Sequence, residues 1–177
     1  MSDGNCNSTI GSMPTTFNNA PDNTSSLSGL FLNTKYSSSC NGTATAWNFC
    51  YYVSEFERQN ISVQAGVWRE ENGSYKLVNG SLIDLPIPEA EIGFQFVCRH
   101  WLLNSTNEFF DVQEGDIVGV YVNDTLDIND VHVMGVHTSG NGLMKTGDIT
   151  DVHSQVSSSE LMQVNYSLYL VSMIGML

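Results

Sequence analysis

The segment Cys40-Asn-Gly-Thr-Ala-Thr-Ala-Trp-Asn-Phe-Cys-Tyr-Tyr-Val53 decides the fold class, because its residue types alternate with period two. One face of the predicted strand carries Thr43, Thr45, Trp47, Phe49, Tyr51 and Val53, and the other carries Ala44, Ala46 and Asn48. This alternation is typical of a β-strand within a sheet. We therefore predict that residues 40–53 contain the central core strand.

The rest of the chain repeats this pattern between turn signals. Further strands are predicted at 29–33, 61–68, 75–78 with its continuation at 82–85, 92–102, 109–112, 117–122, 131–136 and 161–176. In the segment 61–68 the apolar residues fall on one face, and Trp68 falls on the outer face. Glu71-Asn-Gly-Ser74 carries the Asn-Gly pair of a tight hairpin. About nine short strands without a helical period predict an all-β, antiparallel β-sandwich in a single domain, with jelly-roll and immunoglobulin-like topologies both open.

Two segments lack a strand pattern. Residues 1–27 are rich in Ser, Thr, Asn, Gly and Pro, which predicts an extended N-terminal arm before a sandwich domain at 28–177. Residues 138–159 are rich in Gly, Ser and Asp and are expected to form a surface segment. The last segment becomes nearly continuously apolar after Leu168, as in a strand buried on both faces. It belongs either to the centre of its own sandwich or to the edge of a neighbouring subunit.

The charge balance argues against nucleic acid as a partner. Six Lys and Arg residues oppose nineteen Asp and Glu residues, for a formal net charge of −13 in 177 residues. Phosphate binding requires a basic face that six scattered cations do not build. The acidity fits solubility, cation binding or a role in an extracellular matrix. The apolar C-terminal run of about twelve residues is shorter than the roughly twenty that a membrane helix needs.

Asparagine followed two places later by Ser or Thr is the strongest compositional signal. The 17 Asn and 33 Ser plus Thr residues would give about three such sequons by chance, whereas the chain has nine. The nine candidate glycosylation sites are Asn7, Asn23, Asn41, Asn60, Asn72, Asn79, Asn104, Asn123 and Asn165. This excess favours an extracellular, secreted or cell-surface glycoprotein, the alternative being a merely Ser- and Asn-rich composition.

Four cysteines fit two disulfides in an oxidising compartment. The favoured pairing joins Cys6 with Cys40 and Cys50 with Cys98. Alternation opposes it in part, since it places Cys50 and Trp47 on opposite faces and Cys98 on the face of Phe94 and Phe96. A bridge between two sheets would therefore need a bulge or a twist.

Candidate ligand sites are few. Asp124, Asp127, Asn129 and Asp130 crowd one segment, and oxygen-rich loops of this kind can hold calcium. An ordinary solvated loop is the alternative. Trp68 beside Arg69, and Trp101 beside Arg99, are candidates for a sugar-binding patch, against core packing. No Gly-x-Ser-x-Gly turn and no Cys-x-x-Cys pair occurs, so we predict no catalytic residue and no zinc site.

Four motifs carry a family resemblance. They are the segment from Cys40 to Tyr52, Val67-Trp-Arg69, Leu77-Val-Asn-Gly-Ser81 and Glu114-Gly-Asp-Ile-Val-Gly-Val-Tyr-Val122. In this combination, over roughly residues 30–175, the chain resembles extracellular modules of predicted sponge cell-surface and matrix proteins. The resemblance implies an ectodomain that works in adhesion, recognition or extracellular matrix.

The sequence thus favours a non-catalytic, secreted or cell-surface glycoprotein module for adhesion or recognition, with a protein or glycan as its partner. One alternative is a structural subunit of an extracellular filament or biomineral-associated matrix, with self-association through the C-terminal strand. The other is a calcium-dependent carbohydrate-binding module.

Overall fold

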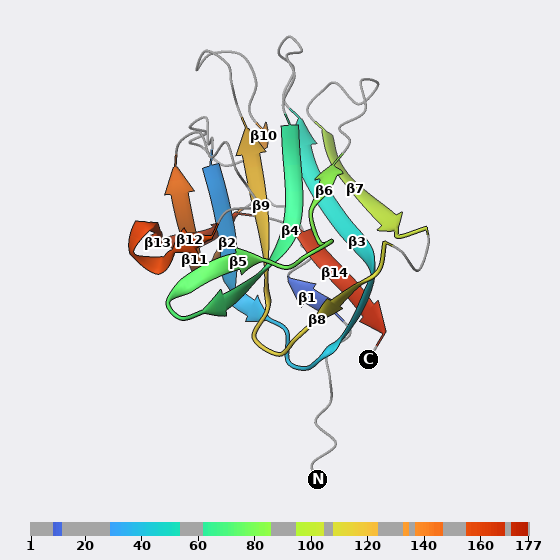
Figure 1. Cartoon of the computed structure of the whole chain (residues 1–177). Helices are drawn as coiled ribbons and strands as arrows, with labels where there is room; N and C mark the ends of the chain where they lie inside the picture. Colours follow the sequence, from blue (N-terminus) through green and yellow to red (C-terminus); the bar gives the residue numbers. More distant parts are fainter. Residues whose placement is uncertain are drawn as a thin grey trace.

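The computed structural model describes residues 9–11, 29–53, 62–85, 95–104, 108–123, 133–134, 137–146, 155–168 and 171–176. The described chain is built from β-strands and one short 3-10 turn, and the strands pair antiparallel, which confirms the all-β, sandwich-like class (Figure 1). The first seven strands are β1 (Thr9–Gly11), β2 (Gly29–Ser37), β3 (Gly42–Val53), β4 (Ser62–Glu71), β5 (Ser74–Leu77), β6 (Ile83–Leu85) and β7 (Gln95–Leu102). The others are β8 (Phe110–Val112), β9 (Ile117–Asn123), β10 (Val133–Met134), β11 (His137–Thr146), β12 (Val156–Ser157), β13 (Met162–Leu168) and β14 (Val171–Met176), with the 3-10 turn η2 (Ser158–Glu160).

The strands form two sheets, which we call sheet A and sheet B. In the described chain, sheet A has six strands: β3 pairs with β14 and β10 along one side and with β7 and β8 along the other, and β1 pairs with β14. Sheet B has eight strands in the order β12-β5-β4-β9-β2-β11-β13, with β6 paired to β4. Figure 1 shows β14 beside β3 and β1, as the strand pairing requires. The final strand therefore pairs within its own chain.

β3 is the central strand of sheet A, as predicted, because strands pair along both of its sides. Its alternation is interrupted by a bulge at Thr45: Ile174 pairs with Ala46, but the next residue, Gly175, pairs with Ala44. An extra residue on one strand shifts every later side chain to the other face. Ala44 and Trp47 can therefore lie in the same core cluster, although the sequence pattern places them on opposite faces.

The space between the sheets is filled by one apolar cluster. Its fully buried members include Ala44 and Trp47 from sheet A and Ala65 and Val67 from sheet B. The Trp47 ring lies 6.1 Å from the Phe110 ring, centroid to centroid. This interface makes the two sheets a sandwich.

Sheet B also buries its other face, around Trp68, which is 0% exposed. The cluster around Trp68 contains Leu30, Leu32, Tyr75, Ile117, Tyr121 and Val156, all from strands of sheet B. Seven flat strands about 4.8 Å apart would place the two outer strands, β12 and β13, about 29 Å from each other. Residues 158–161 alone join these two strands, and they bridge at most about 18 Å. The sheet therefore curls around its own side chains.

The β4–β5 hairpin turns at Asn72 and Gly73, as the Asn-Gly pair predicts. Their φ angles of 52° and 75° are both in the left-handed region, which a two-residue type I′ turn needs. β4 pairs with β5 from Trp68 opposite Leu77 to Glu71 opposite Ser74.

Several segment predictions are corrected. β2 is longer than the strand predicted at 29–33, because it continues to Ser37 through a register shift between Leu32 and Ser37. β11 lies between β2 and β13, so part of the expected surface segment 138–159 is inside sheet B. The predicted single last strand is two strands, with β13 in sheet B and β14 in sheet A. Within the expected N-terminal arm, β1 is a strand paired to β14.

No helix in the described residues is long and apolar enough to cross a membrane.

Candidate functional site

An open groove of about 620 Å³ lies where β4, the β5–β6 loop and β8 meet. Its walls include Arg69, Lys76, Asn79, Phe109, Asp111 and Gln113. Cations, carboxylates, amides and an aromatic ring are therefore within reach of one ligand. A volume of this size is in the usual range of about 300–1,000 Å³ for small-molecule sites.

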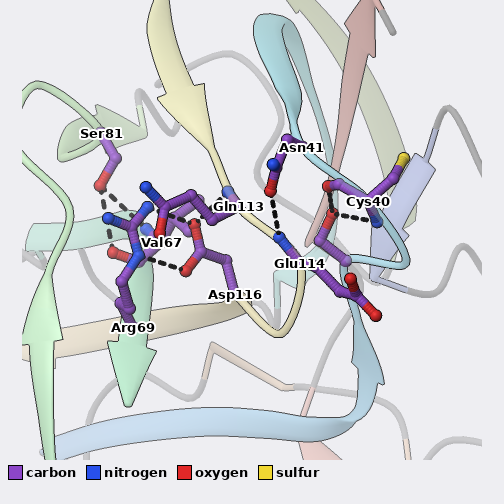
Figure 2. Close-up of polar contacts among 9 residues, drawn as sticks. Cys40, Asn41, Val67, Arg69, Ser81, Gln113, Glu114 and Asp116 are labelled. Carbon is purple, nitrogen blue, oxygen red and sulfur yellow. Dashed lines mark hydrogen bonds and ion pairs between the residues drawn. The ribbon is translucent and has the colours of Figure 1, made fainter. Parts of the chain in front are cut away.

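A charged pair fixes Arg69 in the wall of this groove. The Arg69 Nε and Nη2 atoms donate to Oδ1 and Oδ2 of Asp116, each at 2.8 Å, and Asp116 is 0% exposed (Figure 2). The hydrogen bond to Asp116 raises the pKa of Arg69 above its ordinary value. A guanidinium has five N–H donors, and two of them bond Asp116, so others can serve a ligand in the groove.

The turn before β9 holds Asp116 in place. Its Oδ2 atom accepts a 2.8 Å hydrogen bond from the backbone N–H of Gln113, which closes a turn through Gly115, whose φ is 91°. The Asp116 carbonyl accepts from the Ser38 N–H at 2.7 Å, and the Gly115 N–H donates to the Ser38 carbonyl at 2.9 Å. The carboxylate that orients Arg69 is thus itself fixed by two backbone segments.

Ser81 attaches the β5–β6 loop to β4. Its Oγ accepts from the Val67 N–H at 3.0 Å and donates to the Val67 carbonyl at 3.3 Å (Figure 2). Ser81 is fully buried. The loop therefore has one defined position at the mouth of the groove.

The fold separates the residues of the expected sugar-binding patch. Trp68 lies inside sheet B and cannot offer its ring to a ligand, so its assignment to a surface patch is wrong. Arg69 points from the other face of β4 into the groove. Arg99 and Trp101 lie on β7 of sheet A, where Arg99 is exposed and Trp101 is 43% exposed. β4 is buried on both faces, which the simple alternation of its sequence does not reveal.

The sequon asparagines that can be placed lie at the surface. Asn41, Asn72, Asn79 and Asn104 are all exposed, and all lie in turns or loops. In contrast, Asn33 and Asn48, which are not in sequons, are buried or half-buried within strands. Asn123 and Asn165 lie in β9 and β13, but their side chains are outside the described residues. Asn7, Asn23 and Asn60 also lie outside the described residues.

The Asn41 amide has a defined role. Its Oδ1 atom accepts a 3.0 Å hydrogen bond from the Glu114 N–H, next to the Asp116 turn (Figure 2). Attachment of a sugar uses the Nδ2 atom and leaves this oxygen as an acceptor. Glycosylation of Asn41 is therefore compatible with the contact.

Cys50 and Cys98 are opposite one another on β3 and β7 of sheet A. Both strands belong to one sheet, so a bridge between them does not need the bulge or twist that a bridge between two sheets would require. Directly opposite antiparallel residues have Cα atoms about 4.5 or 5.5 Å apart, within the range of about 4.4–6.8 Å that a disulfide spans. The side chains of Cys50 and Cys98 are not among the described ones, so the disulfide between them stays a prediction. Cys40 is a half-buried free thiol, and Cys6, its expected partner, is not among the described residues.

The proposed calcium ligands Asp124, Asp127, Asn129 and Asp130 fall outside the described residues. Among the residues that are described, no group of three or more His, Cys, Asp and Glu side chains is placed to hold a metal ion.

The groove and its Arg69–Asp116 pair were missed by sequence reasoning. Residues 113–116 lie between two predicted strands, at 109–112 and 117–122, but Asp116 was not assigned a partner. Arg69 and Asp116 are 47 positions apart, and only the alignment of β4 with β9, which sets Trp68 opposite Ile117, brings them together. A long-range register of this kind has no local sequence signal.

The chain was also compared with protein-family models, with curated proteins and with solved structures, and none of the three comparisons gives a match.

Proposed function

We propose that the chain is a non-catalytic, secreted or cell-surface glycoprotein module that works in adhesion or recognition. The observation that carries the proposal is a difference in exposure between the asparagines in sequons and the other asparagines. All four sequon asparagines with a described side chain are exposed in turns or loops, whereas the two other asparagines with a described side chain, Asn33 and Asn48, are buried or half-buried in strands. Surface loops are where glycosylation acceptors are found in secreted proteins.

The alignment of Cys50 with Cys98 supports the same compartment. A cross-strand disulfide at this position would form in an oxidising environment and persist there. The net negative charge and the sandwich fold, with a polar groove on one side, fit a module that presents a binding surface to other molecules.

The test begins with secretion from a eukaryotic cell line, followed by glycopeptide mass spectrometry and by binding to cells and glycan arrays. We expect glycans at several of the exposed sequons, and saturable binding to a cell-surface protein or glycan. Full secretion without a glycan at any of the nine sequons would contradict the proposal.

A second candidate is a structural subunit that assembles edge to edge into a filament or matrix. It is favoured by β7, which pairs with β3 and has no other partner strand among the described residues. This strand exposes Trp101 at 43% and Leu102 at 60%. Open strand edges with apolar side chains promote association between chains. Light scattering over a range of protein concentrations separates the two candidates, because a monomer at every concentration contradicts the filament subunit.

A further inference from the structure

The groove between β4, the β5–β6 loop and β8 has a sequon asparagine in its wall. Asn79 is exposed, and it is part of the groove lining together with Arg69 and Phe109. A sugar attached to Asn79 would therefore start at the groove itself. The other exposed sequon asparagines, Asn41, Asn72 and Asn104, are not part of this lining.

The loop that carries Asn79 is held in one conformation. The Ser81 N–H donates to the Val78 carbonyl at 3.1 Å, which closes a turn with Gly80 at a φ of 78°. The buried Ser81 hydroxyl then bonds both backbone groups of Val67. Because both ends of the turn are fixed, the Asn79 side chain starts from a fixed point at the groove.

The groove wall has the chemistry that binds N-acetylglucosamine. Phe109 is half-buried and provides an aromatic surface on which the C–H face of a sugar ring can pack. Arg69 supplies N–H donors, and Asp111 and Gln113 are exposed polar groups that can bond sugar hydroxyls and the acetamide group. At about 620 Å³, the space is in the range that holds a drug-sized ligand, which two sugar rings resemble in size.

We propose that the first sugars of an N-linked glycan on Asn79 dock in this groove and pack against Phe109. The proposal rests on the secreted, glycosylated character proposed above. In the transfer, the amide nitrogen of Asn79 displaces the diphosphate of a lipid-linked oligosaccharide. An N–C1 bond replaces the C1–O bond, and the nitrogen loses one proton to a base.

The burial of Ser81 also determines whether the glycan is added before or after the β5–β6 loop docks on β4. The acceptor motif is read through both its asparagine and the hydroxyl two residues later, and this hydroxyl is 0% exposed in the folded chain. The glycan must therefore be added before the β5–β6 loop docks on β4. Docking of the loop then brings the attached sugars into the groove.

The test measures how fast a peptide-N-glycosidase removes each glycan from the folded, secreted protein. Asn104 is the matched control, because it is also an exposed sequon asparagine and lies outside the groove. We expect release from Asn79 to be at least about tenfold slower than release from Asn104, which corresponds to a docking free energy of about 1.4 kcal/mol. After denaturation the two rates should become equal. Phe109→Leu, which keeps an apolar side chain but removes the aromatic face, should speed release at Asn79 only.

The outcomes separate this inference from the proposed function. Equal release from Asn79 and Asn104 in the folded wild type overturns the docked glycan but leaves the glycoprotein intact. Glycans at other sites with Asn79 unoccupied also overturn it. In that case, binding of free chitobiose to the groove, followed by NMR, would assign the groove to a sugar from another molecule. The absence of glycans at every sequon would refute the proposed function itself.

Discussion

A side chain at Gly119 on β9 should destabilise the fold, because Gly119 packs directly against the buried Trp68 indole. Gly119 pairs directly with Gly66 on β4, so two residues without side chains lie opposite each other under the ring. A Cβ atom on Gly119 would lie 2.6 Å from Leu32 Cδ2, 2.7 Å from Trp68 Cζ3 and 2.8 Å from the Phe31 carbonyl oxygen. The backbone oxygen cannot move aside as a flexible side chain can.

We expect Gly119→Ala to lower the free energy of unfolding by about 1–2 kcal/mol. Overpacking a core by one methyl group costs about 1–3 kcal/mol, and three contacts below 3.0 Å, one of them to a backbone oxygen, place this site in the upper half of that range. The reduced chain entropy of the unfolded state offsets about 0.4–1 kcal/mol of this cost. For a chain of this size the change corresponds to a melting temperature lower by about 2–8 °C. Urea titration followed by tryptophan fluorescence, together with calorimetry, measures both quantities.

Two further variants isolate the cause. Trp68→Phe removes one of the three atoms that the new methyl would meet, the Trp68 Cζ3 atom, so the double variant should be more stable than the sum of the single effects by at least about 0.5 kcal/mol. Gly115→Ala is the control, because Gly115 has a φ of 91° but nothing within 4 Å of an added Cβ. Its destabilisation should come from backbone strain and should not depend on Trp68. A neutral Gly119→Ala variant, or strict additivity with Trp68→Phe, would refute the packing argument.

Three other perturbations have defined outcomes. Arg69→Met should lower the free energy of unfolding by about 3 kcal/mol, because it leaves the buried Asp116 carboxylate without its cation. Urea titration measures this change, and a loss below about 1 kcal/mol would mean that water or another group replaces the guanidinium. Non-reducing peptide mapping of the secreted protein should recover Cys50 linked to Cys98, and quantitative alkylation of both thiols without reductant would exclude the bridge. The hydrogen bond from Lys145 lowers the pKa of Glu160 below its ordinary 4.5, so the contact stabilises the fold above that pH and is lost as the pH falls through the lowered pKa. The difference in melting temperature between wild type and Glu160→Gln should therefore shrink between pH 7 and pH 3, and a constant difference would show that the charge plays no part.

The elements that could be predicted from the sequence are those with local signals. The alternation in residues 40–53 identifies β3 because half-buried strands need two different faces. Asn72 and Gly73 identify the β4–β5 hairpin because both can adopt positive φ angles at little cost.

The elements that could not be predicted depend on how distant strands meet. Sheet B curls far enough to cover its own second face, so Trp68 is buried where alternation places it outside. β11 has a Gly- and Ser-rich sequence but lies between two strands, because backbone hydrogen bonds to β2 and β13 do not require particular side chains. In both cases the structure depends on contacts between residues that are far apart in the sequence.

The bulge at Thr45 is a local feature of β3 that also determines how distant strands meet. One extra residue in β3 turns Ala44 toward the core cluster that also contains Trp47, and it separates the part of β3 that pairs with β8 from the part that pairs with β7. Because β8 begins at Phe110, which packs against Trp47 and lines the groove, the bulge also sets where the groove wall lies. A strictly alternating β3 would move every side chain on one side of Thr45 to the other face. The local irregularity in the central strand is therefore a condition for both the sandwich core and the groove beside Asn79.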